Sequence, residues 1–88
     1  MADILVKMKY LIRGGESKTR VDLIISLTKM DSENMISAIH DHLVKGYQDT
    51  DASLLNDVKL PNFNKAMVRL NEIAGIVEDI KKRRLGAV

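Results

Sequence analysis

The sequence predicts a small all-α domain. Apolar residues recur at steps of three and four along most of the chain, which is the period of an amphipathic helix. Glycine, proline and capping residues divide this pattern into about five segments of helix length. The run Leu23-Ile24-Ile25 could instead form a strand, but no second strand is evident with which it could pair, so helix is preferred. The 88 residues predict one domain over 1–88.

The first two helices are defined by a glycine pair and a serine. Apolar residues from Ile4 to Ile12 predict an N-terminal helix within residues 1–13, and Gly14-Gly15 ends it. Ser17 can cap a second helix over 18–27. Its inward positions are Val21, Ile24 and Ile25.

The next two helices are expected over 32–45 and from about Asp49 to Asp57. Asp31 or Ser32 caps the longer one, and Gly46 follows it in the left-handed conformation that glycine adopts without steric cost. Asp49 or Thr50 caps the shorter one. The longer helix has a buried stripe made of Met35, Ile36, Ile39 and Leu43.

The fifth helix has Pro61 in its first turn, where the missing N–H costs nothing. It has the longest apolar stripe in the chain, made of Phe63, Ala66, Met67, Leu70, Ile73, Ala74, Val77 and Ile80. This stripe packs against the earlier helices or against a second subunit, and a small chain favours a homo-oligomer. Residues 81–88 begin with Lys81-Lys82-Arg83-Arg84 and are expected to be a frayed basic tail.

Composition limits the function classes. The chain has no cysteine, which excludes disulfides and thiolate metal sites. Its net charge of +2 permits nucleic-acid binding without requiring it. Aromatic residues make up 3%, too few for a platform that stacks single-stranded bases. No signal-peptide pattern or membrane span is present, so we expect a cytoplasmic protein that does not contact a membrane.

Residues 49–70 fit a helix-turn-helix that binds double-stranded DNA. Ser53 can be the small residue where the two helices cross, Val58 the apolar residue of the turn, and Phe63 an anchor together with Ala66 and Met67. Leu54 and Leu55 are expected on the buried side of the first helix. The interpretation that competes with it is an ordinary helical hairpin with a solvated polar face.

Charge is divided between the two halves of this segment. Gly46 to Asp57 contains three acids and no Lys or Arg, whereas Val58 to Asn71 contains three bases and no acid. We therefore expect the second helix to contact DNA. Asn and Arg side chains can bond base edges and Lys contacts phosphate. The candidate contacts are Lys59 on the backbone, with Asn62, Asn64, Lys65 and Arg69 on the helix.

Other polar groups indicate no further site. Arg13, Lys18 and Arg20 could touch phosphates, but a solvated loop is the simpler interpretation. His40 and His42 are two residues apart, so they point to different sides of a helix and do not form a metal site. No Ser-His-Asp or Cys-His arrangement is visible, and we expect neither an enzyme, a cofactor nor a small-molecule ligand.

The sequence from Leu11 to Ile80 resembles the PapB/FocB family of adhesin-biosynthesis transcription regulators. The resemblance is carried by LIRGGES (11–17), LIISLTKMDSENMISAIHDHLVKG (23–46), Asn62-Phe63 and MVRLNEIAGIVEDI (67–80). It implies an all-helical fold with a helix-turn-helix. It also implies oligomeric binding to repeated T/A-rich DNA near fimbrial promoters, with a minor-groove component, and switching of fimbrial operons. A protein of this kind is expected to be associated with the bacterial nucleoid. Gly46, Phe63, Arg69 and Leu70 match the family pattern.

The sequence departs from the family pattern at two places, and one of them, Asp49, together with the low net charge favours an alternative function. Asp49 and Ser53 stand where the family has a basic residue and a cysteine tied to DNA binding, and Lys59-Leu60-Pro61 replaces its turn. Asp49 would repel a phosphate. The alternative is a helical protein–protein adaptor that acts on another regulator through the long apolar stripe of the fifth helix, without contacting DNA.

Overall fold

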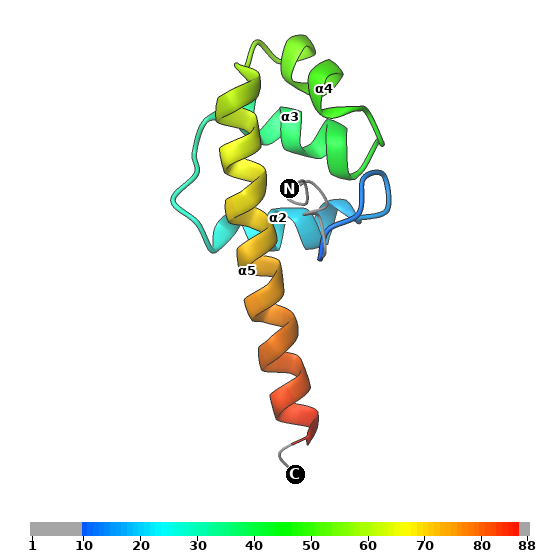
Figure 1. The fold of residues 1–88 in the computed structure, drawn as a ribbon, viewed down its shortest axis with the longest axis vertical. Coiled ribbons are helices and arrows are strands. Elements are labelled where there is room, and N and C mark those ends of the chain that lie inside the picture. The colour runs from blue at the N-terminus through cyan, green and yellow to red at the C-terminus, as the bar shows by residue number, and fades with distance from the viewer. Residues whose placement is uncertain (1–9, 87–88) are drawn as a thin grey trace, which may run out of the picture.

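The computed structural model describes residues 10–86, with side chains through residue 82, and this part of the chain contains four helices and no strand. They are α2 (Lys18–Ser26), α3 (Glu33–Leu43), α4 (Asp49–Leu55) and α5 (Leu60–Gly86). α2 and α3 lie one above the other across the N-terminal half of α5, and α4 covers the end of the molecule near the start of α5 (Figure 1). The all-α prediction is confirmed.

The predicted N-terminal helix is wrong where it can be compared. Residues 1–9 lie outside the described part, and residues 10–13 form no helix. Two of their amides find other acceptors: the N–H of Tyr10 donates to the side-chain oxygen of Asn71 in α5 (2.9 Å), and that of Ile12 donates to the Glu16 carboxylate (2.8 Å). Gly14, which follows them, donates its N–H to the His42 carbonyl (3.1 Å). These bonds attach the segment to α5 and to the C-terminal end of α3, in place of the i−4 bonds of a helix.

α2 and α3 begin at the serines expected to cap them. The Ser17 hydroxyl accepts from the Arg20 amide (3.1 Å), and the Ser32 hydroxyl accepts from the Met35 amide (3.3 Å). Each hydroxyl satisfies an amide that has no partner inside its helix. Gly46 follows α3 with φ of +85°, as its position predicted. The strand alternative for Leu23-Ile24-Ile25 is wrong, since these residues lie in α2.

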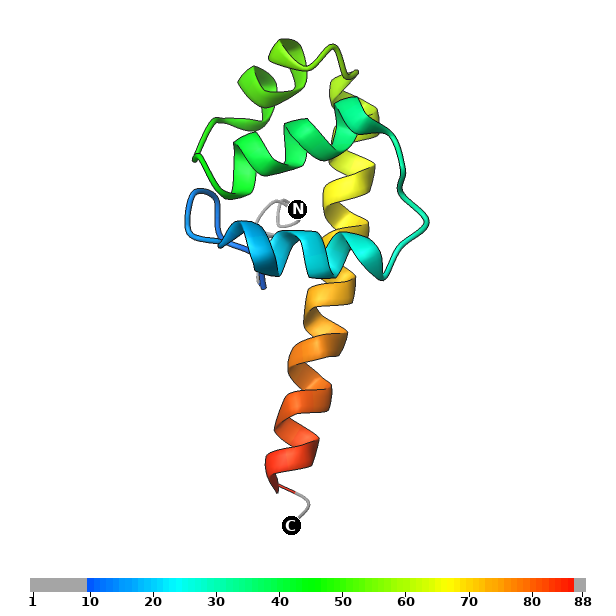
Figure 2. The same cartoon turned by 180° about the vertical axis from the view of Figure 1, so that it is seen from behind.

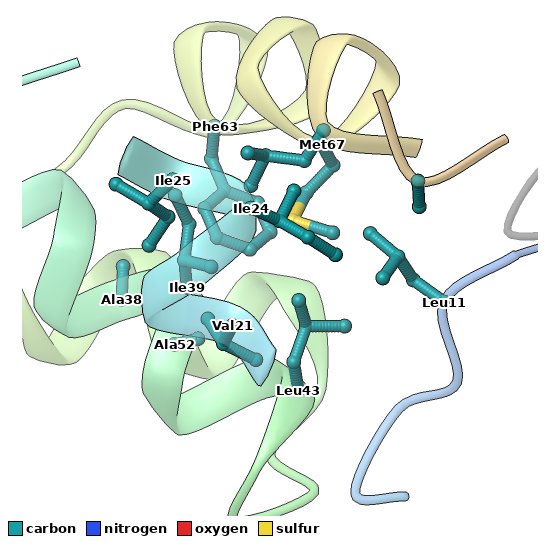
Figure 3. Close-up of a cluster of buried hydrophobic side chains, with 12 residues drawn as sticks. Leu11, Val21, Ile24, Ile25, Ala38, Ile39, Leu43, Ala52, Phe63 and Met67 are labelled. Atoms are coloured by element: carbon teal, nitrogen blue, oxygen red, sulfur yellow. The ribbon is translucent and has the colours of Figure 1, made fainter. Parts of the chain in front are cut away.

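The hydrophobic core lies between α2, α3 and the N-terminal half of α5. Figure 3 shows the Phe63 ring of α5 among Ile24 and Ile25 of α2 and Ile39 of α3. The buried apolar residues are Leu11, Val21, Ile24, Ile25, Ala38, Ile39, Leu43, Ala52, Phe63, Met67, Leu70 and Ala74. On the predicted stripe of α3, Met35 and Ile36 are only partly buried, and Ala38 and His42 are buried in addition.

α5 extends well beyond the core. It continues through residues 81–86, so the expectation of a frayed segment there is wrong for those residues. Both views show its C-terminal half projecting past α2 (Figures 1 and 2). Near the middle of α5, the Tyr10 ring lies so close to Gly75 that a Cβ at this glycine would come within 2.8 Å of it. Within residues 10–86, no helix is apolar enough over sufficient length to cross a bilayer.

Candidate nucleic-acid interface

α4, a four-residue connection and the start of α5 form the unit that would present the candidate residues. α4 ends in a glycine-type cap without a glycine: Asp57 adopts φ of +57°. The Asp57 amide donates to the Leu54 carbonyl (3.2 Å), and the Val58 amide donates to the Ser53 carbonyl (2.9 Å). These two bonds make a Schellman motif, which reverses the chain and directs it into α5.

Small residues let α4 pack closely against its neighbours. Ala52 and Ser53 are buried, and the Ser53 hydroxyl donates to the Asp49 carbonyl one turn earlier. Asn56 fixes the end of α4, because its amide nitrogen donates to the Asp41 carboxylate of α3 and to the Ala52 carbonyl, both at 2.8 Å. The prediction that Ser53 is a small packing residue is confirmed.

Three predictions about α4 are wrong. Asp49 and Thr50 are not N-caps: the cap residue is Gln48, which makes no side-chain cap bond, and the Asp49 carboxylate accepts from the Thr50 amide at 2.8 Å inside the helix. The helix ends at Leu55 and does not reach Asp57. Leu54 and Leu55 do not fill its buried side, because they are 81% and 66% exposed.

The start of α5 is anchored on its inner side by Phe63, which is fully buried. Its ring meets the His42 ring edge to face, with centroids 5.5 Å apart and planes at 89°. His42 is itself fixed by a bond of 2.7 Å between its Nδ1 and the Tyr47 carbonyl. Met67 and Leu70 continue the buried side, Ala66 is partly buried, and Val58 of the turn packs against the core.

The predicted contact residues lie on the surface. Lys59, Asn62, Asn64, Lys65 and Arg69 are all exposed. At 3.6 residues per turn, Asn62, Lys65 and Arg69 follow the i, i+3, i+7 spacing and share one face of α5. Asn64 follows Asn62 by two residues and therefore points to a different side. The helix brings three of its four predicted contacts together and separates the fourth.

Arg69 keeps freedom to bind a ligand. Its guanidinium lies 3.8 Å from the Glu72 carboxylate, a distance typical of a weak ion pair, and both side chains are about 60% exposed (59% and 60%). An exposed pair of this kind contributes at most about 1 kcal/mol. A phosphate or a base edge could therefore replace Glu72 at low cost.

The cations near the Gly14-Gly15 loop are used within the protein. Lys18 bonds Asp22 (2.9 Å), and Arg20 bonds Glu16 (2.9 Å) and approaches Glu78 of α5 (3.8 Å). The bond from Lys18 holds the pKa of Asp22 below its usual value, and a bond from His40 acts in the same direction. Arg20 thereby links α2 to α5, which favours a structural role for this group of charges.

The two histidines point to different partners. His40 Nε2 lies 2.7 Å from the Asp22 carboxylate of α2, whereas His42 faces Tyr47 and Phe63. Within residues 10–86, no three His, Cys, Asp or Glu side chains come together in a way that could hold a metal ion. A single imidazole without further ligands would not hold a metal ion.

Comparisons with known proteins agree with this fold. The chain aligns with the crystal structure of E. coli FocB at a TM-score of 0.77 and 23% identity, over 90% of this chain and 92% of that one. No curated protein matches the sequence significantly. The model of the PapB family, described as adhesin biosynthesis transcription regulatory protein, matches residues 1–83. The chain therefore belongs to this family of transcription regulators.

Proposed function

We propose that this regulator binds double-stranded DNA through the first turns of α5 and that residues 49–70 act as a helix-turn-helix. The observation that carries the proposal is the two-sided character of this helix. Phe63, Met67 and Leu70 are buried on one side, while Lys65 and Arg69 are exposed elsewhere on the same turns. A helix held in this way can present its cationic side to a groove without unfolding any of the core.

The contacts are assigned by chemistry and by position. Lys59 precedes the helix and Lys65 lies along it, and both are suited to phosphates. Asn62 and Arg69 carry groups that bond base edges in pairs. Asn64 points to a different side of α5, so we propose that it contacts the flank of the groove and contributes less than Asn62.

The DNA target is inferred from the family. We propose that copies of the chain bind repeated T/A-rich sites near an adhesin promoter as a homo-oligomer, in the cytoplasm and on nucleoid DNA. The low net charge of +2 supports cooperation between copies. A single copy with few phosphate contacts has only a modest electrostatic affinity, and several linked copies multiply it.

The test is charge reversal on this face. Lys65→Glu combined with Arg69→Glu should remove binding to a T/A-rich promoter fragment while helix content remains that of the wild type. Lys29→Glu with Lys45→Glu is the matched control, since it changes the net charge equally at two exposed lysines outside the unit. If the site variant binds as well as the control, the α5 assignment is wrong.

A second candidate is the adaptor, and the exposed leucines of α4 favour it. An adaptor would bind another regulator through apolar contacts and would not touch DNA. Salt separates the two functions, because DNA affinity falls by about 0.9 logarithmic units per phosphate contact for each tenfold rise in salt. Affinity that is independent of salt, or dependent on a protein partner, would favour the adaptor.

A further inference from the structure

α4 carries an apolar patch that no described part of the chain covers. Leu54 and Leu55 are 81% and 66% exposed. Asp51 lies on the same face, because it precedes them by three and four residues. These three residues and Tyr47 line one shallow depression of about 490 Å³. We call Tyr47, Asp51, Leu54 and Leu55 the α4 patch. Exposed apolar surface of this kind marks an interaction site when it is gathered in one place.

The projecting end of α5 carries a second patch. Ile76 and Ile80 stand one turn apart and are 56% and 52% exposed. Neither view shows another described helix beside this part of α5 (Figures 1 and 2). Lys81 and Lys82 follow directly and are exposed. We call Ile76, Ile80, Lys81 and Lys82 the α5 patch. A helix end that lacks packing is only marginally stable in water, so a partner would stabilise it.

The two patches differ in the sign of their charge. Gly46 to Asp57, around the α4 patch, contains three acids and no Lys or Arg, and Arg13 also lines the depression. The α5 patch ends in Lys81 and Lys82, and two more bases follow; Glu78 and Asp79 precede them, and the Glu78 carboxylate lies 3.7 Å from Lys81. The patches also lie at opposite ends of the molecule (Figure 1), whose longest dimension is 46 Å. They therefore cannot meet within one copy.

We propose that the α4 patch of one copy binds the α5 patch of a second copy, head to tail. Apolar side chains meet in the middle, and carboxylates face lysines at the edge. Two α4 patches would bring like carboxylates together, and two parallel α5 patches would bring their basic runs together. Because the contact joins two different surfaces, an open array keeps one free patch at each end and can grow by adding further copies.

The size of the contact predicts how it is used. A few leucine and isoleucine side chains cover much less than the roughly 1,200 Å² of a stable interface, so the affinity in solution is low. Neighbouring DNA sites would raise the effective concentration of the patches and make binding cooperative. This role on DNA rests on the proposed function, but the head-to-tail contact itself does not.

The experiment uses two complementary variants of the full chain in the absence of DNA. Leu54→Glu with Leu55→Glu removes the α4 patch, and Ile76→Glu with Ile80→Glu removes the α5 patch. Amide NMR and sedimentation velocity follow association. The wild type should associate with rising concentration, and each variant alone should remain a folded monomer. A mixture should form a dimer that grows no further, with amide shifts of the labelled α5-patch variant confined to the α4 patch.

The control is a matched apolar pair on another surface. Leu23 of α2 and Leu27, which caps its C-terminal end, are 61% and 54% exposed and one turn apart, so Leu23→Glu with Leu27→Glu should associate like the wild type. Three results would overturn the proposal: a wild type without concentration-dependent shifts, a mixture that does not associate, or an α4-patch variant that still associates by itself while the α5-patch variant does not. The third result would indicate symmetric pairing of α5.

Failure of the two proposals can be told apart. Lys65→Glu with Arg69→Glu leaves both patches intact, so this variant should associate like the wild type without DNA. If the wild type associates head to tail but binds no DNA, the proposed function fails and the contact stands. If DNA binding responds to Lys65 and Arg69 but no association occurs, only the contact is wrong.

Discussion

Replacement of Phe63 by alanine should separate the stability of this domain from its binding chemistry. Phe63 is fully buried, and its ring packs edge to face on His42. A buried Phe→Ala change costs about 3–5 kcal/mol, including the cavity that it leaves. The whole domain is expected to be stable by about 4–13 kcal/mol, from typical values per residue. The change therefore removes a large part of the free energy of unfolding, and in a marginal domain nearly all of it.

Urea denaturation followed by circular dichroism measures this loss, with Phe63→Leu as the graded comparison. The leucine variant keeps most of the apolar volume and should lose only about 1–2 kcal/mol. It should then bind DNA with the affinity of the wild type once the folded fraction is taken into account, because Lys65 and Arg69 face away from the ring. A loss below about 1 kcal/mol for Phe63→Ala would refute the view that this ring anchors α5.

Three further predictions concern the turn, the loop and pH. Asp57→Gly should raise the free energy of unfolding by up to about 1 kcal/mol and so raise the urea midpoint slightly, because glycine tolerates a φ of +57° without steric cost. A lower midpoint would mean that the carboxylate itself stabilises the turn. Gly14→Ala should cost more than about 1 kcal/mol in the same assay, since φ is +72° and the new Cβ would lie 3.0 Å from the Gly46 Cα. The hydrogen bond from Lys18 lowers the pKa of Asp22 from its ordinary 3.8, so stability gained from ionised Asp22 is present above that pH and is lost as pH falls through the lowered pKa. The difference between wild type and Asp22→Asn should accordingly shrink in acid, and a difference that is constant with pH would contradict this reasoning.

The periodicity of the sequence was sufficient to predict α2, α3 and most of α5, because these helices bury a continuous apolar side. Ser17 and Ser32 marked two helix starts for a local reason, since their hydroxyls accept from amides three residues later. The exposed position of Lys65 and Arg69 followed from the same period. Their role toward DNA remains a prediction.

The errors arose where tertiary contacts outweigh the local pattern. Residues 10–13 have apolar spacing, but the amides of Tyr10 and Ile12 bond to the side chains of Asn71 and Glu16, which no periodicity reveals. Leu54 and Leu55 were expected inside because they are apolar. α4 instead turns its small residues Ala52 and Ser53 inward, where they are buried.

The separation of Asn64 from Asn62 does not depend on tertiary contacts. It follows from the helical period alone, and it could have been predicted from the sequence by placing each residue around the axis. Polar residues that are close in the sequence need not share a face of a helix. The candidate face of α5 is therefore narrower than the predicted set and consists of Asn62, Lys65 and Arg69, with Lys59 before the helix.

Asp49 gives a physical reason why α4 is less suited than α5 to contact DNA. A carboxylate in the first turn of α4 is favourable for the helix itself, since it offsets the partial positive charge of the N-terminus. The same carboxylate repels a phosphate backbone, so α4 is poorly suited to lie against DNA where the family has a basic residue. The outer face of α4 carries leucines and a further acid, which suit a protein contact better than a nucleic acid. On this view the two helices divide the work, α5 binding DNA through Lys65 and Arg69 and α4 binding the next copy of the chain.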